Sequence, residues 1–309
     1  MAERRQVDYI PGISPARSWK SLNSWDAILA ALIAFVAAGF CWKAGAAADH
    51  AWEWGSLMPY LIAGDGAGGW HAGLLLRGLL GTLRLGMWAT AVALVTGVMV
   101  GVLSARLRGP AALPAVLYVT LMRNTPPLVL LFLVYFFAGS VFAEPLQGAA
   151  DLMDALPDGL RAFFAAAVAP PEQLDRMAAA VLTLGLYSGA YVAEIVRAGI
   201  EGVDQGQWEA ASSLGMGSWD RMRLVIAPQA VPMMIPPLTG QCISIFKETA
   251  LASVISVPEL TFQSLEVMAV SRMTFELWLV TAALYCGVSL VLAAMGRRLE
   301  KRFRLSAVP

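Results

Sequence analysis

Long apolar runs with almost no charged residues recur along this 309-residue chain, and they constrain its fold more than any other feature. An α-helix rises 1.5 Å per residue, so about 20 such residues cross a bilayer. Hydrophobic residues make up 58% of the chain and charged residues 14%, whereas soluble domains carry about 25% charged residues. We therefore predict an all-α, polytopic membrane protein. Its six expected spans lie within residues 27–42, 85–105, 109–143, 177–193, 224–246 and 277–296.

The charges between these runs differ in sign from one connection to the next. Basic residues gather in the N-terminal tail at 1–24, at 106–108, at 197–223 and at 297–304, whereas acidic residues dominate 139–177. Positively charged loops remain in the cytoplasm. We therefore predict that the tail is cytoplasmic, that both termini lie on that side, and that the acidic segment is a periplasmic insert.

The insert at 139–177 is predicted to form one or two short amphipathic helices on the outer surface. Its apolar residues include Leu152, Leu156, Leu160 and Phe163-Phe164. These side chains would lie either on the membrane surface or on the protein itself, and the pattern does not decide between the two.

The first apolar run has two interpretations. Trp25 and Trp42 bracket it as interfacial anchors do, which favours a retained N-terminal helix and an external loop, together residues 25–70. Alternatively, the run belongs to a cleaved signal with Ala46-Ala47-Ala48 as the cleavage site. The charged lead before the run is longer than such signals usually have, which favours the retained helix. Cleavage would leave the orientation of the other spans unchanged.

Motifs for catalysis or cofactor binding are missing from the sequence. There is no G-x-x-x-x-G-K-[ST] phosphate loop, no H-E-x-x-H zinc motif and no G-x-S-x-G nucleophile motif. Cys41, Cys242 and Cys286 lie in apolar runs without metal-ligand spacing, which is typical of buried structural cysteines. We therefore expect no enzyme activity, no catalytic residue, no bound cofactor or metal, and no nucleic-acid partner.

The connection at 201–228 carries the most informative pattern. A short amphipathic helix at 207–214 is followed by Gly215 and Gly217, which can end it, and by a second helix that runs into Pro228. Small residues in the first helix would let another surface approach closely. The pattern fits a docking site for a soluble partner and a tightly packed loop without a partner equally well.

This connection resembles the EAA motif of permeases in binding-protein-dependent ABC importers. Glu209-Ala210-Ala211, Gly215 and Pro228 match that motif, whereas Val225 and Ala227 depart from the usual Ile and Leu. In that family the loop is the coupling helix that docks into a groove of the ATP-binding subunit. The resemblance implies that the following residues contact the ATPase: Trp208, Glu209, Ala210, Ala211, Leu214, Gly215, Met216 and Gly217.

The resemblance covers about residues 73–304 and narrows to the polar amino-acid branch. The segments that carry it are 123–129, 185–211, 226–240 and 246–260. Asn124 and the long insert are similar to glutamate/aspartate or general L-amino acid permeases, whereas Pro127 and Leu130 depart from the branch pattern. The resemblance implies a five-helix type I ABC importer core within residues 71–304, one extra N-terminal transmembrane helix, and a C-terminal tail at 305–309.

The same resemblance implies a set of partners. We expect a second permease subunit, identical or related, that completes the translocation pathway, and two ATP-binding subunits that hydrolyse ATP. A periplasmic amino-acid-binding protein would deliver the cargo, and the assembly would lie in the bilayer of the bacterial inner membrane. Two alternatives remain open: an ATP-independent channel or ion-coupled carrier, and a membrane scaffold or sensor that keeps the docking loop without transport.

Polar residues at membrane depth are candidates for a substrate pathway, because burying them in lipid is costly. Arg123 precedes Pro126-Pro127, where the helix must break and line either protein or a wet cavity. Lys247 and Glu248 are adjacent and so cannot face each other along a helix. A structural role in ion pairs or helix contacts remains the alternative for each candidate, and is favoured for Tyr187 and Ser188. The candidates are Arg123, Asn124, Thr125, Tyr187, Ser188, Lys247, Glu248 and Thr249.

Overall fold

The computed structural model describes residues 52–64, 69–107, 109–271 and 273–306, together with seven residues of the N-terminal segment. It divides into two units, Met1–Trp52 and Glu53–Pro309. Seven described residues of the first unit are helical and fall within the first predicted span: 28, 31, 32, 34, 35, 38 and 39. The remainder of that span and the alternative cleavage site at 46–48 lie outside the described residues.

The second unit begins with short elements of regular secondary structure rather than with an irregular loop. A 3-10 turn, η1 (Trp54–Leu57), and a short helix, α2 (Met58–Leu61), lead to the antiparallel strands β1 (Ile62–Gly64) and β2 (Trp70–Ala72). The register pairs Ala63 with His71. Gly73 follows, and a Cβ atom there would lie 2.3 Å from the carbonyl oxygen of Tyr60. Glycine thus allows the hairpin to pack against α2 just before the first long helix.

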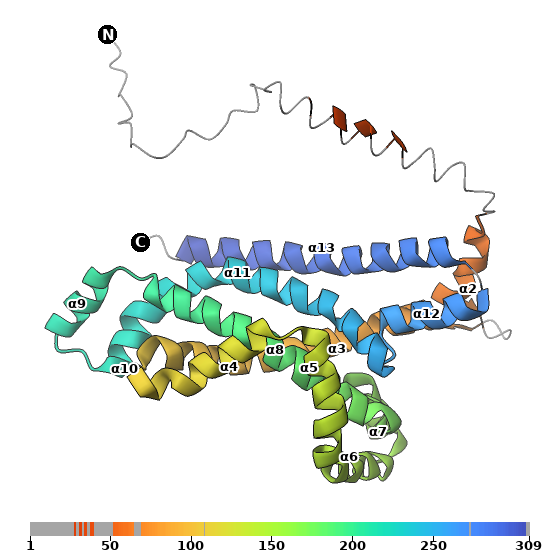
Figure 1. Cartoon of the computed structure of the whole chain (residues 1–309), viewed down its shortest axis with the longest axis horizontal. Helices are drawn as coiled ribbons and strands as arrows, with labels where there is room; N and C mark the ends of the chain where they lie inside the picture. The colour runs from red at the N-terminus through yellow and green to blue at the C-terminus, as the bar shows by residue number, and fades with distance from the viewer. Residues whose placement is uncertain are drawn as a thin grey trace. The chain divides into compact units, whose positions relative to one another are not determined.

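Three long helices run through the second unit with α11 alongside them (Figure 1): α3 (Leu74–Arg106), α8 (Leu174–Glu201) and α13 (Thr274–Ser306). By length and apolar composition, the described residues contain three helical stretches able to cross a membrane: Leu74–Arg106, Asp158–Glu201 and Thr274–Phe303. The predicted span at 85–105 is therefore the second part of a longer helix, because α3 already begins at Leu74.

The contact between α3 and α8 depends on glycines spaced four residues apart on both helices. A Cβ atom on Gly97 would lie 2.4 Å from the Cβ of Val192, and one on Gly189 would lie 2.3 Å from the Oγ1 of Thr96. Gly101 and Gly185 continue the two stripes. Small residues at this spacing let membrane helices approach closely and gain van der Waals contact. The glycines therefore explain why these two helices pack together.

The segment between α3 and α8 breaks where the prolines predict. A 3-10 turn, η2 (Gly109–Ala112), leads to α4 (Leu113–Asn124), and α5 (Pro127–Leu133) follows after a bend of 109°. If this bent pair counts as one span, the described residues hold up to four spans. The predicted helix break at Pro126-Pro127 is confirmed.

The insert contains two short helices, as predicted. A π-helical turn, η3 (Val134–Ala138), continues into α6 (Gly139–Asp154), and α7 (Asp158–Ala167) follows. The 3-10 turn η4 (Pro171–Gln173) then leads to α8. The helices α6 and α7 protrude sideways from the long helices (Figure 1).

The connection after α8 forms a hairpin at one end of the second unit (Figure 1). It consists of α9 (Gln205–Ser213), the single turn α10 (Ser218–Asp220) and the π-helical segment η5 (Arg221–Ile226), which runs into α11 (Ala227–Glu248). The helix α11 contains Pro232, Pro236 and Pro237 and packs against α8 and α13.

A helix that the sequence analysis did not predict, α12 (Leu260–Ser271), lies between α11 and α13, after the 3-10 segment η6 (Thr249–Ile255). Its first turn is held by Glu259, which is fully buried. The carboxylate accepts hydrogen bonds from the backbone amides of Thr261 (2.9 Å) and Phe262 (2.7 Å) and from the hydroxyls of Tyr285 (2.6 Å) and Thr82 (3.4 Å). One side chain therefore joins α3, α12 and α13.

Candidate functional site

The helix α9 has a defined start and a defined end. Asp204 caps its N-terminus, and its Oδ1 accepts a hydrogen bond from the backbone amide of Gly206 (2.8 Å). At the other end, Gly215 adopts a φ of +75°. The amide of Gly215 donates to the carbonyl of Ser212 (3.0 Å) and that of Met216 donates to the carbonyl of Ala211 (3.2 Å). This is the Schellman arrangement, which favours glycine at the left-handed position.

The two arms of the hairpin are tied together by Arg221 of η5. Its guanidinium donates hydrogen bonds to the hydroxyls of Ser212 and Ser218 and lies over the ring of Trp208, 5.7 Å from the centroid. Arg106, at the end of α3, donates to the carbonyl of Ser218 (3.3 Å). Sequence reasoning missed Arg221, because its partners become visible only once the chain turns back at Gly215.

The residues expected to contact an ATPase divide into an exposed and a packed group. Leu214 is 81% exposed at the tip of the hairpin, and Trp219, which the sequence analysis did not single out, is 67% exposed. Glu209 is exposed and accepts one hydrogen bond, from the Gln205 side chain (3.4 Å). Ala210, Gly215 and Gly217 are exposed as well, whereas Ala211 is buried and Trp208 and Met216 are half-buried. The hairpin therefore has a packed inner side and an outer side that the described residues leave exposed.

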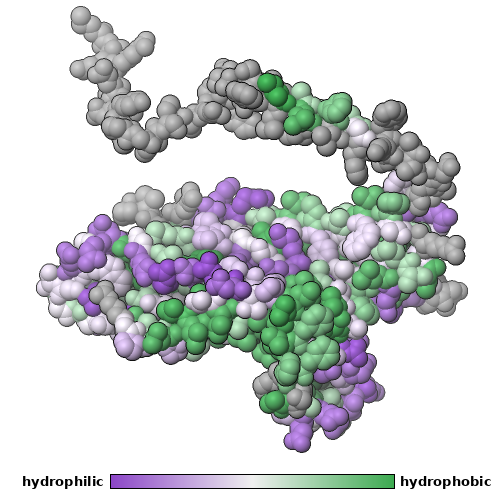
Figure 2. All heavy atoms as spheres, in the orientation of Figure 1, coloured by the Kyte–Doolittle hydropathy of each residue, from purple (hydrophilic) through white to green (hydrophobic). Residues whose placement is uncertain are grey.

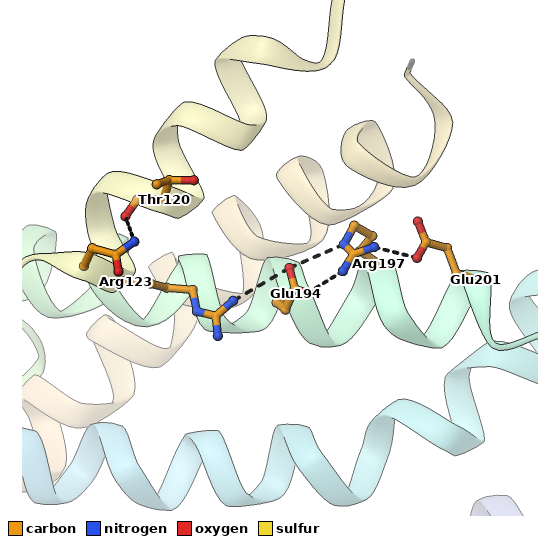
Figure 3. Close-up of polar contacts among 6 residues, drawn as sticks. Thr120, Arg123, Glu194, Arg197 and Glu201 are labelled. Atoms are coloured by element: carbon orange, nitrogen blue, oxygen red, sulfur yellow. Dashed lines mark hydrogen bonds and ion pairs between the residues drawn. The ribbon is translucent and has the colours of Figure 1, made fainter. Parts of the chain in front are cut away.

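A second polar cluster lies where α4 ends beside α8 (Figure 3). The Arg123 guanidinium is 3.9 Å from the Glu194 carboxylate, and it lies over the ring of Tyr191, 5.3 Å from the centroid. Tyr191 in turn shares a hydroxyl–hydroxyl hydrogen bond of 3.2 Å with Tyr187. The structure therefore brings two pathway candidates, Arg123 and Tyr187, into contact with the same residue, Tyr191.

Glu194 is shared between two cations, as Figure 3 shows. It pairs with Arg123 on one side and with Arg197 on the other, and Arg197 also pairs with Glu201 (2.5 Å). The ion pair that the sequence suggested between Glu194 and Arg197 is confirmed. The side chains of Arg123 and Glu194 are 42% and 35% exposed in this chain, so the cluster remains accessible from one side.

The remaining candidates do not all join this cluster. Ser188, which is buried, donates a hydrogen bond to the Glu248 carboxylate (3.3 Å) and so links α8 to the end of α11. Lys247 is exposed, and Thr249 is buried and donates to the carbonyl of Phe246 (2.8 Å). Glu248 and Lys247 therefore differ in exposure, as expected for adjacent helix positions.

The side chains of Asn124 and Thr125 form hydrogen bonds with carbonyls of α4. The amide of Asn124 donates to the carbonyl of Thr120 and the hydroxyl of Thr125 to the carbonyl of Leu121, both at 2.8 Å. These bonds satisfy the last carbonyls of α4 at the break. In the part of the chain that the structure describes, no group of three or more His, Cys, Asp and Glu side chains is placed to hold a metal ion.

Comparisons with known proteins extend these observations. The family described as "binding-protein-dependent transport system inner membrane component" matches residues 97–305. The glutamine transport system permease protein GlnP of Escherichia coli (strain K12) is 32% identical over 226 residues, covering 72% of this chain and 91% of that protein. The glutamate/aspartate import permease protein GltK of Escherichia coli O6:H1 is 29% identical over 210 residues, covering 68% of this chain and 80% of that protein.

Solved structures agree with this assignment. An amino acid ABC transporter crystallised with histidines has a chain that is 33% identical, with a TM-score of 0.58, and the match covers 74% of this chain and 94% of that one. A chain of the MetNI methionine ABC transporter in an inward-facing conformation shares the fold at 19% identity, with a TM-score of 0.54 and coverage of 74% and 96%. Since the family match spans the hairpin, the polar cluster and the helices that hold both, the chain belongs to the inner-membrane components of binding-protein-dependent transport systems.

Proposed function

We propose that this chain is a permease subunit of an ATP-driven amino-acid importer and that the α9–η5 hairpin is its contact with the ATPase. The observation that carries the proposal is the hairpin itself. It is capped at both ends, tied internally by Arg221, and presents the exposed Leu214 and Glu209 outward. A rigid element with a free apolar tip suits a groove on a soluble subunit.

The connectivity of the hairpin supports a mechanical role. The chain leaves α8 at Glu201 and enters α9 at Gln205, and η5 continues directly into α11. A force applied to the hairpin therefore acts on the ends of two membrane helices that pack against each other. Closure of two ATP-binding subunits would tilt α8 and α11 and open the pathway to the other side of the membrane. ATP would be bound and hydrolysed in those partner subunits.

The proposed assembly follows the family pattern. A five-helix type I core, preceded by one extra N-terminal helix, would pair with a second permease copy, and a periplasmic binding protein would deliver the cargo. Both termini would lie in the cytoplasm of a bacterium, because the basic connections gather on that side. The contact residues would be the outward-facing members of the hairpin, with Ala211 and Met216 packing behind them.

We propose polar L-amino acids as the cargo, with the acidic or general type favoured. Relatives named for glutamine and for glutamate/aspartate support this class. Arg123 carries a positive charge at the contact between α4 and α8, and Glu248 carries a carboxyl group at the contact between α8 and α11. A zwitterionic amino acid has both a carboxylate and an ammonium group, and such groups interact well with these side chains.

The experiment is purification of the complex through a C-terminal tag, followed by uptake in liposomes with and without ATP. Leu214→Asp and Glu209→Lys should lower recovery of the ATPase and abolish ATP-dependent uptake. The first variant puts a charge on the apolar tip of the hairpin, and the second reverses the charge of an exposed residue on the docking side. Val270→Asp, which changes a 77% exposed residue on α12, is the matched control and should leave recovery unchanged.

Three results would contradict the proposal. Equal ATPase recovery and uptake in all three variants would remove the hairpin from the ATPase contact. Solute transport by the wild-type chain alone without ATP would favour the channel or ion-coupled carrier. ATPase recovery without any uptake would favour the scaffold or sensor.

A further inference from the structure

The helices α6 and α7 expose large apolar side chains that the described residues of the second unit leave uncovered. On α6, Val141 is 72% and Leu152 is 68% exposed; on α7, Leu160 is 50%, Phe163 is 63% and Phe164 is 40% exposed. Exposed apolar surface gathered in this way marks an interaction site.

On α6 these residues form a stripe that is separate from the side packed on the protein. Val141 and Leu152 are eleven residues apart, which is close to three helical turns, so they lie on one face. A second face, with Leu146 and Met153, packs against the main core. A third face carries acidic residues such as Asp151. The exposed stripe is therefore not the core-facing side of the helix.

On α7 the division is simpler. Leu160, Phe163 and Phe164 are spaced i, i+3 and i+4 and share one face, as in an amphipathic helix. Arg161 projects from another side and forms an ion pair with Asp154 at the end of α6 (2.8 Å). That ion pair joins the two helices across the turn between them. It does not involve the apolar face of α7, whose side chains stay largely exposed.

The insert is also anchored to the long helices. The guanidinium of Arg84 donates to the carbonyl of Ala165, and the indole of Trp88 donates to the carbonyl of Ala167, each at 2.8 Å. Both donors belong to α3, and both acceptors lie in the last turn of α7. The carbonyls of a last helical turn have no partner within the helix, so these side chains supply the missing hydrogen bonds. The exposed face of α7 is consequently held in place.

The hydrophobic side of the insert continues the surface of the membrane helices. Figure 2 shows that the protrusion is hydrophobic on the side that continues from α5 and hydrophilic on the opposite side. The connecting segment η3 adds Phe136 and Phe137, which are 64% and 72% exposed. An apolar face that merges with lipid-facing helices, backed by a polar face, is the arrangement of a helix lying in a membrane interface.

We propose that the α6–α7 hairpin is a membrane-surface element whose apolar face inserts into the leaflet at the end of α8 opposite to α9. Leu152, Leu160, Phe163 and Phe164 would lie among the upper acyl chains, and the acidic face would lie in water. The residues from α6 to α7 carry Glu144, Asp151, Asp154 and Asp158 against Arg161. Attraction to anionic headgroups therefore does not contribute, and the partner is the apolar part of the lipid, whatever its headgroup. This inference does not depend on the cargo or on the ATPase contact.

The experiment places nitroxide labels on the insert in the assembled complex, reconstituted in phosphatidylcholine nanodiscs. The background carries Cys41→Ala, Cys242→Ala and Cys286→Ala, with ATP-dependent uptake as the check that it assembles. Test positions are Leu152→Cys and Phe163→Cys. Their neighbours, Asp151→Cys and Ala162→Cys, are the matched controls, because both are exposed on other sides of the same helices.

Labels at 152 and 163 should collide severalfold more with lipid-soluble oxygen, relative to a water-soluble nickel complex, than labels at 151 and 162. Equal accessibility to the nickel complex at 162 and 163 would show that the face lies in water and would overturn the proposal. Immobile labels that neither reagent reaches would show a protein contact, such as a second copy of this chain, and would overturn it as well.

A second measurement uses the unmodified complex, so it does not depend on the cysteine variants. Phosphatidylcholine with a photoreactive group near the glycerol backbone is activated in the membrane, and modified peptides are identified by mass spectrometry. Adducts within residues 139–167 and along α13 are expected. Adducts along α13 without any on the insert would contradict the proposal.

Discussion

The left-handed turn at Gly215 gives the sharpest prediction about the hairpin. Gly215→Ala adds a Cβ atom that meets nothing within 4 Å, so packing contributes no penalty. The backbone does contribute one, because φ is +75°, and an L-residue in the left-handed region costs about 1–2 kcal/mol. A free energy of this size changes a two-state ratio by a factor of about 5–30.

The least costly response of the variant is to open the turn. Opening releases the two hydrogen bonds that end α9, from the amides of Gly215 and Met216. We therefore expect hydrogen exchange at residues 214–216 of the purified complex to be faster by a factor of about 5–30 in Gly215→Ala. Mass spectrometry of a peptide covering 205–217 measures this, and exchange in α3 provides an internal reference.

Two further variants test the reasoning. Gly217 has a φ of −60°, which alanine adopts freely, and a Cβ there would be 3.8 Å from the nearest atom, an oxygen of Asp220. Gly217→Ala should therefore leave exchange unchanged. Gly215→Asn should recover much of the protection, because asparagine tolerates the left-handed region. Equal exchange in Gly215→Ala and Gly217→Ala would refute the conformational explanation.

Two other predictions concern the glycine contact between α3 and α8 and the polar cluster around Glu194. Gly97→Leu should destabilise the protein by about 1–3 kcal/mol or more, because the added side chain overpacks against Val192. This loss is measured as a lower Tm. The control Gly287→Leu, at a position with open space around its Cβ, should change the Tm little. Glu194→Gln should change the free energy of unfolding by less than about 1 kcal/mol, because the ion pairs are partly exposed. A reduced uptake rate with an unchanged Tm would support a place in the pathway, whereas unchanged uptake would assign the cluster to structure.

The elements that sequence reasoning recovered are those determined by local chemistry. Apolar composition predicted the long helices, and the missing amide protons of Pro126-Pro127 predicted the break between α4 and α5. The helical insert and the glycine-terminated hairpin also follow from patterns within about ten residues.

The elements that it missed depend on distant partners. The helix α12 starts at Glu259, whose carboxylate is held by Thr82 and Tyr285, far away in sequence. Likewise, Arg84, in the part of α3 before the predicted span, donates to the carbonyl of Ala165 on α7, a partner that no local pattern indicates. The contact between Arg123 and the Tyr191 ring also joins two helices that no local pattern connects. Such partners become known only from the fold.

The two helices that leave the α9–η5 hairpin differ in stiffness. The helix α8 has 28 residues without proline, is therefore about 42 Å long, and packs against α3 along its whole glycine stripe. The helix α11 has three internal prolines, each of which removes a backbone hydrogen bond and permits a bend. The same displacement of the hairpin would thus rotate α8 as one body but curve α11 partway along its length. The gap between the two helices would widen most beyond the prolines, on the side where Ser188 meets Glu248.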